Sequence, residues 1–471
     1  MFRTALLILS GNAFSSLMTL LRTLIVVRLI SVEDYGIAAT FAISLAIVEM
    51  MSALGLQQMI VRDSRGDDPH FQAALQGFQM LRAVVLAVVL FLLAPFFAGF
   101  LGVPEVTWAY RLLALVPLLN GLKHFDIHRL NRRMSFRPLI LSNAVPAVVS
   151  VLLVWPLFLL FGDFRVMLWA VLMQAVFGVA VSHLVAERRF RLVFDVAVIR
   201  EGLGFGWPIL VNGALLFAVF HGEKLIVGRE LGMEVLAIFA MGMTLTLTPT
   251  LVMAGSLSNF FLPQVSAVKD ERERFNALSL AVIQASLLGG ALFLVAMLFV
   301  GGPLVHVLLG EKYAPLVPYL VWLAALQAVR VFKVGGAVLA LATGHTRNPM
   351  YANVLRVALL PLGWYVVARG GSLLLLIQIA ILGEILGMIV ASVFSHHILK
   401  VPFRPVVLPL LLTAGVVLLS CLAVTAGGGL IAPGAPLWLA LGALLLCLPG
   451  FLSMRALRDY AGKRVMTGFG E

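Results

Sequence analysis

Long apolar segments recur from one end of the chain to the other, and they constrain its fold more than any other feature of the sequence. A helix needs about 20 apolar residues to cross the hydrocarbon core of a bilayer. Polar backbone groups in lipid must be satisfied within their own segment, so each crossing segment is expected to be an α-helix. Fourteen segments qualify: residues 5–30, 36–61, 72–100, 107–123, 138–161, 166–186, 205–229, 235–262, 276–301, 316–342, 350–368, 373–397, 406–426 and 435–454.

Composition agrees with an all-α polytopic membrane protein. The chain is 61% hydrophobic and 12% charged, whereas soluble domains are about half apolar and a quarter charged. The two cysteines, Cys421 and Cys447, lie in apolar runs and predict neither a disulfide framework nor a metal cluster. There is no Walker A pattern and no soluble segment large enough for a glycosyltransferase site. We therefore expect a transport protein without a cofactor rather than an enzyme.

The distribution of basic residues predicts the topology. With the N-terminus in the cytoplasm, 22 of the 34 Lys and Arg fall in the inside segments and three in the outside loops. Cytoplasmic loops collect Lys and Arg, so the split predicts an even number of spans with both termini in the cytoplasm. The same rule accounts for the net charge of +12 without a nucleic-acid partner. The apolar run that follows the N-terminus lacks a cleavage site and is expected to be a retained first helix.

Residues 23–40 and 224–241 are similar when aligned without a gap. The matches include two charged pairs, Arg28 with Arg229 and Glu33 with Glu234. Both segments start from the same predicted side of the membrane, so the repeat is parallel. It predicts two pseudo-symmetric six-helix lobes, residues 1–200 and 201–400, around a central cavity. Residues 401–471 are expected to add two further helices and a cytoplasmic tail.

The first predicted helix carries a polar stripe at helical spacing. Its members are Asn12, Ser15, Ser16, Thr19 and Arg22. Ordinary helix–helix hydrogen bonding is the simpler explanation for Ser15 and Thr19. A buried arginine costs several kcal/mol unless it is paired or hydrated, so Arg22 favours a functional explanation. Arg28 lies nearer the predicted outer surface and has the option of extending its side chain to the headgroups.

A second cationic group lies in the predicted helix 316–342. Gln327, Arg330 and Lys333 follow one another at intervals of three, and that helix has no acidic residue within its apolar run. Two like charges so close repel each other. The pattern predicts either an anionic ligand or a carboxylate from another helix opposite these side chains.

Embedded acids are fewer than embedded cations. Glu49, Glu223 and Glu384 are candidates for an ion or proton site, and Glu223 is the repeat counterpart of Arg22. The excess of cations favours a cationic lumen and an anionic substrate. The alternative is a set of structural ion pairs and side chains that extend to the headgroups.

The loop KHFDIHRLNRRMSFR, Lys123 to Arg137, is the densest basic stretch of the chain. Fixing the topology and attracting anionic headgroups explain it more simply than recruiting a charged lipid substrate does. The nearby sequence SRGDDPH has two adjacent aspartates, for which a solvated turn is a simpler explanation than a metal site.

The segment RTLIVVRLISVEDYGIAATFAISLAIVEMMSALGLQQMIVRD resembles the start of Wzx-type polysaccharide-export flippases, members of the multidrug/oligosaccharidyl-lipid/polysaccharide (MOP) exporter superfamily. The pattern that carries the resemblance is the turn from Arg28 to Gly36, followed by Gly55-Leu56 before the basic loop at Arg62. The resemblance implies a bacterial inner-membrane protein that moves undecaprenyl-diphosphate-linked oligosaccharides by alternating access. Arg22 and Arg28 match the position of the cavity arginines of related lipid II flippases.

The resulting hypothesis assigns roles to these side chains. Arg22, Arg330 and Lys333 hold the diphosphate, Arg28 and Arg229 assist at the outer side, and Asn12, Thr19 and Gln327 add polar contacts. Expected partners are the lipid-linked oligosaccharide and membrane lipids, together with a polysaccharide polymerase and chain-length or export proteins. Three alternatives remain: an ion-coupled antiporter of small amphipathic molecules, a lipid II-type flippase, and a membrane scaffold that transports nothing.

Overall fold

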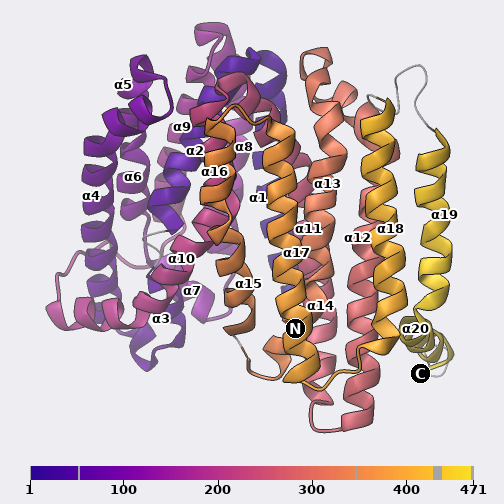
Figure 1. The fold of residues 1–471 in the computed structure, drawn as a ribbon. Helices are drawn as coiled ribbons and strands as arrows, with labels where there is room; N and C mark the ends of the chain where they lie inside the picture. Colours follow the sequence, from indigo (N-terminus) through magenta and orange to yellow (C-terminus); the bar gives the residue numbers. More distant parts are fainter. Residues whose placement is uncertain (1, 51–53, 346, 428–436, 468–471) are drawn as a thin grey trace. The chain divides into compact units, whose positions relative to one another are not determined.

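The computed structural model describes residues 2–50, 54–345, 347–427 and 437–467, and in these residues all regular structure is helical. The chain divides into two compact units, Met1–Ala237 and Ile238–Glu471. The helices are labelled in Figure 1. The prediction of an all-α polytopic architecture is confirmed.

The first unit contains ten complete helices among its described residues and the start of an eleventh. They are α1 (Phe2–Leu29), α2 (Val32–Met50), α3 (Leu56–Arg62), α4 (Pro69–Phe100), α5 (Thr107–Leu113), α6 (Leu115–Leu122), α7 (Asp126–Arg132), α8 (Arg137–Phe161), α9 (Arg165–Leu184), α10 (Val196–Glu230) and the start of α11 (Met233–Ala267). Within this unit α8 packs against α1 and α9, α4 packs against α5 and α6, and α10 packs against α2.

The second unit contains the rest of α11 and nine further helices among its described residues. They are α12 (Arg272–Leu308), α13 (Val317–Phe332), α14 (Val334–Ala342), α15 (Arg347–Ala358), α16 (Leu360–Ala368), α17 (Leu373–His397), α18 (Arg404–Gly427), α19 (Leu437–Ser453) and α20 (Arg455–Thr467). Here α12 packs against α13 and α18, α17 packs against α13 and α15, and α18 packs against α19.

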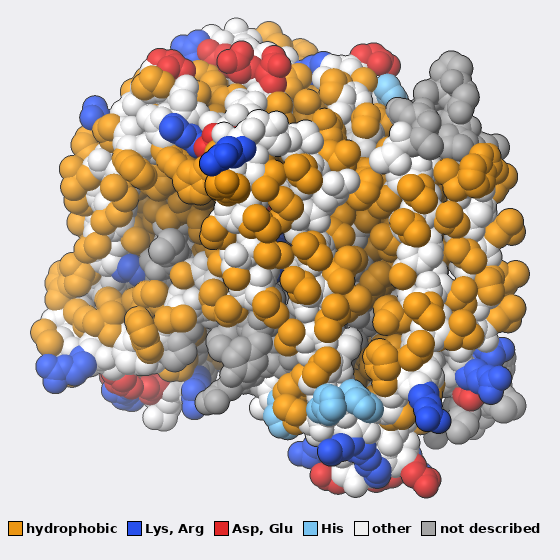
Figure 2. All heavy atoms as spheres, viewed as in Figure 1, with side chains coloured by type: hydrophobic (Ala, Val, Ile, Leu, Met, Phe, Trp, Pro, Cys, Tyr) orange, Lys and Arg blue, Asp and Glu red, His pale blue; other side chains and the backbone are white. Residues whose placement is uncertain are grey.

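Lipid-facing surface is visible on the helices of each unit. In Figure 2 hydrophobic side chains cover the middle of the helices, whereas Lys, Arg, Asp and Glu gather near their ends. On α8, for example, Leu159 and Leu160 are 70% and 74% exposed. In the described residues nine helices are long and apolar enough to cross a membrane, or ten if the bent pair α19 and α20 forms one span. The predicted count of fourteen spans therefore stays a prediction.

Four predicted spans are interrupted in the structure. The predicted span 36–61 is divided between α2, which ends at Met50, and α3, which begins at Leu56 after Gly55 in a left-handed conformation. Residues 107–123 divide into α5 and α6, residues 316–342 into α13 and α14, and residues 350–368 into α15 and α16. Pro117 and Pro361 lie in the first turn of α6 and α16, and proline has no N–H to continue the preceding helix. The break between α13 and α14 falls at Lys333, which places this cation at a joint between two helical pieces.

The boundary between the units differs from the predicted boundary between the lobes. The repeat places α10 at the start of the second lobe, whereas the division by compactness keeps α10 with α2 in the first unit. The repeat and the lobes 1–200, 201–400 and 401–471 stay predictions.

Two adjoining short helices, α3 and α7, lie beside a small hydrophobic core. Leu56, Met59 and Ile60 of α3 are buried together with Phe71 of α4 and Phe125. The aspartate pair is used locally, as the sequence suggested. Asp68 accepts hydrogen bonds from the first N–H groups of α4, and Asp67 pairs with Arg133.

Candidate functional site

Arg22 lies in the C-terminal half of α1 and is only 7% exposed. Its Nη1 donates hydrogen bonds to Ser150 Oγ on α8, at 3.4 Å, and to Gln174 Oε1 on α9. Its Nε atom is buried and has no hydrogen-bond partner in the described part of the chain. The contacts of α8 with both α1 and α9 bring these three side chains together.

The partners of Arg22 are neutral. Among the residues described, no carboxylate forms an ion pair with its guanidinium. A hydroxyl and an amide oxygen satisfy single N–H groups, but they do not neutralise the charge. Arg22 is thus a buried cation that neutral protein groups orient.

The rest of the stripe contributes less than the sequence suggested. The hydroxyl of Thr19 donates to the backbone oxygen of Ser15, 3.0 Å away in the same helix, which is the usual way a threonine is satisfied inside a helix. The Asn12 side chain lies outside the described residues. The described structure therefore singles out Arg22 from the stripe.

A second cluster forms around Glu384 in the second unit. Glu384 lies on α17 and is fully buried. Its Oε1 accepts from Arg330 Nε at 2.7 Å and from Arg356 Nη1 at 2.8 Å, and its Oε2 accepts from Lys333 Nζ. Gln327 holds Arg330 from the other side, because its Oε1 accepts from Arg330 Nη1 at 2.9 Å.

This arrangement decides between the two explanations left open for Arg330 and Lys333. A carboxylate from another helix lies opposite them, so an anionic ligand is not needed to explain either cation. Three cations nevertheless share this one carboxylate. Arg356 was not among the residues predicted for this site. The signal was Glu384 itself, since an acid in the middle of an apolar helix requires a cationic partner.

The other two acids of the hypothesis belong to the first unit. Glu49 accepts a hydrogen bond from Asn120 Nδ2 at 3.5 Å and lies within electrostatic range of Lys123 and Arg82. Glu223 is buried in α10, beside Lys224. Both acids therefore have cations nearby, and their proposed part in ion or proton coupling stays a prediction.

Arg28 and Arg229 lie at helix ends. Arg28 is exposed in the last turn of α1. Arg229 donates to the backbone oxygens of Gly99 and Phe100, at 3.3 and 2.8 Å, and its guanidinium lies over the Phe100 ring. Carbonyl groups at a helix C-terminus lack partners within their own helix, so Arg229 caps the end of α4.

The described residues contain no group of three or more His, Cys, Asp or Glu that could hold a metal ion.

Comparison with known proteins places the chain in a family. The polysaccharide biosynthesis protein family matches residues 25–318, which is more than half of the chain. The chain belongs to this family.

Two curated relatives are similar to it. The succinoglycan biosynthesis transport protein ExoT of Rhizobium meliloti (strain 1021) is 24% identical over 65% of this chain. The teichuronic acid biosynthesis protein TuaB of Bacillus subtilis (strain 168) is 21% identical over 73% of this chain and 72% of its own length. The match spans 62% of the length of ExoT.

Solved structures of the MOP superfamily share the fold of this family member. The lipid II flippase MurJ in an inward closed conformation gives a TM-score of 0.70 at 14% identity, covering 97% of this chain and all of that chain. An inward-facing multidrug transporter of the MATE family gives a TM-score of 0.64 at 14% identity, covering 80% of this chain and 93% of that chain. At such low identity the likeness shows the fold alone. The resemblance to polysaccharide-export proteins noted in the sequence is confirmed by the family match.

Proposed function

We propose that this chain is a flippase that moves undecaprenyl-diphosphate-linked oligosaccharide units across the bacterial inner membrane, with both termini in the cytoplasm. Arg22 carries the proposal. It is a buried cation whose partners in the described structure are a hydroxyl and an amide. A diphosphate supplies the missing negative charge, and its oxygens match the planar donor fork of a guanidinium. Membership of a polysaccharide biosynthesis family supports the choice of a saccharide cargo.

The cluster around Glu384 supplies a second positive region in this proposal. Arg330, Lys333 and Arg356 gather three cations around the carboxylate of Glu384. A passing diphosphate competes with the carboxylate for these donors, so the cluster holds the substrate weakly enough to release it. Gln327 keeps Arg330 oriented during this exchange.

Arg28 and Arg229 receive a different role from the one first expected. Arg28 is exposed at a helix end, and Arg229 caps α4. We assign both to anchoring helix ends at the membrane surface, a common use of arginine at such positions. The polymerase and export proteins suggested by the sequence stay proposed partners.

An antiporter of small amphipathic molecules is the second candidate, because MATE transporters share this fold and one fold hosts several functions. Arg22 argues against it for cationic drugs, since a positive charge without a carboxylate repels them. A lipid II-type flippase needs the same diphosphate chemistry and differs only in the sugar.

The test compares Arg22→Gln with Arg28→Gln in cells whose own copy of the gene is deleted. Both variants remove one positive charge from α1, but only Arg22 is buried. We expect Arg22→Gln to abolish polysaccharide export and to leave lipid-linked units on the cytoplasmic side, whereas Arg28→Gln exports normally. The amount of each variant in the membrane is measured alongside.

Normal export from both Arg22→Gln and Arg330→Gln contradicts the proposal. Altered drug resistance with intact polysaccharide favours the antiporter instead. Normal export from all lumen variants, with lost co-purification of envelope proteins after loop substitutions, favours a scaffold.

A further inference from the structure

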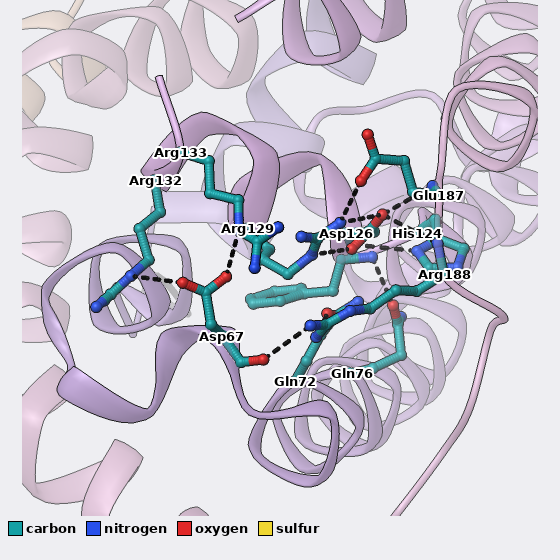
Figure 3. Close-up of polar contacts among 11 residues, drawn as sticks. Asp67, Gln72, Gln76, His124, Asp126, Arg129, Arg132, Arg133, Glu187 and Arg188 are labelled. Atoms are coloured by element: carbon teal, nitrogen blue, oxygen red, sulfur yellow. Dashed lines mark hydrogen bonds and ion pairs between the residues drawn. The ribbon is translucent and has the colours of Figure 1, made fainter. Parts of the chain in front are cut away.

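A basic pocket of about 220 Å³ opens at the end of the first unit that the topology prediction places in the cytoplasm. It lies between the first turns of α4 and the connector 185–195, which joins α9 to α10. Its polar lining consists of Gln72, Gln76, His124, Arg188, Arg189 and Arg191. All of these residues lie in the first unit, and Figure 3 shows four of them together with the network that supports them.

The connector is held in place by its backbone. Asp126, at the start of α7, accepts hydrogen bonds from the N–H groups of Glu187 and Arg188 at 2.9 and 3.2 Å. Farther along, the N–H of Val193 donates to the backbone oxygen of Ala73 at 3.1 Å. A Cβ at Gly77 would lie 2.0 Å from the Val193 oxygen, so glycine is required for this close approach. The wall that carries the arginines is therefore a fixed part of the fold.

His124 provides a buried donor in this pocket. The side chain is 3% exposed, and its Nδ1 accepts a hydrogen bond from the Asp126 N–H at 3.1 Å. The ring proton must then be on Nε2, whose contact with the Arg188 backbone does not reach good hydrogen-bond geometry. Burial lowers the pKa of His124 below its usual range, so the ring is neutral at pH 7. A buried N–H that is poorly satisfied is costly, so this donor is available to a better-placed acceptor.

The arginines of the pocket keep their charge available. Arg188 donates to Gln72 Oε1 at 2.9 Å and to the Asp67 backbone oxygen at 2.8 Å, and neither acceptor is charged. Arg189 and Arg191 are exposed and form no ion pair with a described carboxylate. The nearby acids are engaged elsewhere.

Two acids beside the pocket, Asp126 and Glu187, both pair with one arginine outside it. Arg129 binds Asp126 at 2.5 Å and Glu187 at 2.9 Å (Figure 3). The pocket is thus positively charged, while its negative neighbours already have a cation. This separation explains why so many arginines remain together on one short connector.

We infer that this pocket is a binding site for a phosphate-bearing anion, held by Arg188, Arg189 and Arg191 and by the Nε2–H of His124. Guanidinium groups bind phosphate oxygens through paired N–H donors, and a neutral ring N–H adds a directed hydrogen bond. The site is formed by residues outside the candidate spans together with the first turns of α4. It is therefore separate from Arg22 and does not depend on the transport function proposed above. The phosphate belongs either to a soluble molecule or to a lipid headgroup.

The test uses the full chain in nanodiscs and two matched double variants. Arg189→Gln with Arg191→Gln removes two exposed charges of the pocket. Lys269→Gln with Arg274→Gln removes two exposed charges, one from the loop between α11 and α12 and one from the first turn of α12, and serves as the control. Inorganic diphosphate is titrated into neutral-lipid discs at fixed ionic strength. In a parallel arm, native mass spectrometry counts the phosphatidylglycerol molecules that stay bound after release from mixed-lipid discs.

We expect the variant with Arg189→Gln and Arg191→Gln to lower either the affinity for diphosphate or the amount of retained phosphatidylglycerol at least about tenfold, with the control unchanged. Saturable diphosphate binding assigns a soluble ligand, and retained phosphatidylglycerol without diphosphate binding assigns a lipid headgroup. His124→Phe, which removes the Nε2–H without changing the charge at pH 7, should weaken the same signal. Equal binding by the wild-type chain and the pocket variant in both arms overturns the inference, as does an equal loss in the control.

Discussion

Replacing Glu384 by Gln removes the only carboxylate that the described residues place among Arg330, Lys333 and Arg356. The substitution keeps the shape of the side chain, so the effect isolates its charge. Glu384 is fully buried and Arg356 is 4% exposed, and the two atoms of this pair are 2.8 Å apart. Removing one partner of a buried ion pair costs about 3–5 kcal/mol, because the remaining charge stays buried without compensation.

This cost predicts a measurable fall in thermal stability. Unfolding entropy is about 2.1 cal/mol/K per residue, so a loss of this size lowers the midpoint of a unit as long as Ile238–Glu471 by about 5–10 °C. The assay heats the purified chain in detergent and measures the fraction that remains monodisperse on size-exclusion chromatography. The matched control is Glu311→Gln, whose side chain is 88% exposed and pairs only weakly with His306.

A double variant tests the cause. If uncompensated charge is responsible, adding Arg356→Met to Glu384→Gln should recover part of the lost stability, because one fewer buried cation remains. A midpoint for Glu384→Gln within about 1 °C of the wild type would refute the reasoning. A double variant less stable than Glu384→Gln would show that Arg356 stabilises the unit by packing rather than through its charge.

Two further predictions concern the first unit. His128 in α7 is buried, and burial beside Lys123 lowers its pKa to about 4. Between pH 6.5 and pH 4 the unfolded chain therefore binds a proton that the folded chain does not, and the free energy of unfolding falls by about 2 kcal/mol from pH 7.5 to pH 5. His128→Phe should reduce the fall in thermal midpoint over this pH range. The same pH profile in the variant and the wild type would contradict the prediction. At Gly36 a Cβ would lie 2.0 Å from the backbone oxygen of Met233. Gly36→Ala should therefore lower the thermal midpoint by an amount equivalent to about 1–3 kcal/mol of unfolding free energy. An unchanged midpoint would mean that α2 and α11 separate at no cost.

The Gly36 contact also gives a physical reason for one letter of the pattern that carries the family resemblance. The turn from Arg28 to Gly36 ends where the start of α2 meets the first residue of α11. A side chain on Gly36 would push the two backbones apart. The glycine of this turn is thus required by packing between segments far apart in the sequence, and its place in the pattern needs no substrate to explain it.

Hydropathy along the chain is enough to predict that this protein lies in a bilayer and that its fold is all-α. Apolar runs long enough to cross a bilayer, with few charges inside them, leave the helix as the way to satisfy their backbone. The polar stripe on α1 also correctly singled out Arg22 as a buried cation. These conclusions rest on properties of single segments, which sequence patterns report directly.

Which charges compensate one another depends on how the helices pack. Arg330 and Lys333 look like free cations along their own helix, and Glu384, which pairs with both, lies more than 50 residues away along the chain. The basic pocket likewise exists because Asp126 and Ala73 fasten the connector 185–195 against α4. Hydropathy and helical spacing describe one segment at a time, whereas ion pairs and pockets form where separate segments pack. That is why Arg22 was foreseen as a buried charge, while the neutrality of its partners was visible only once α8 and α9 were in place.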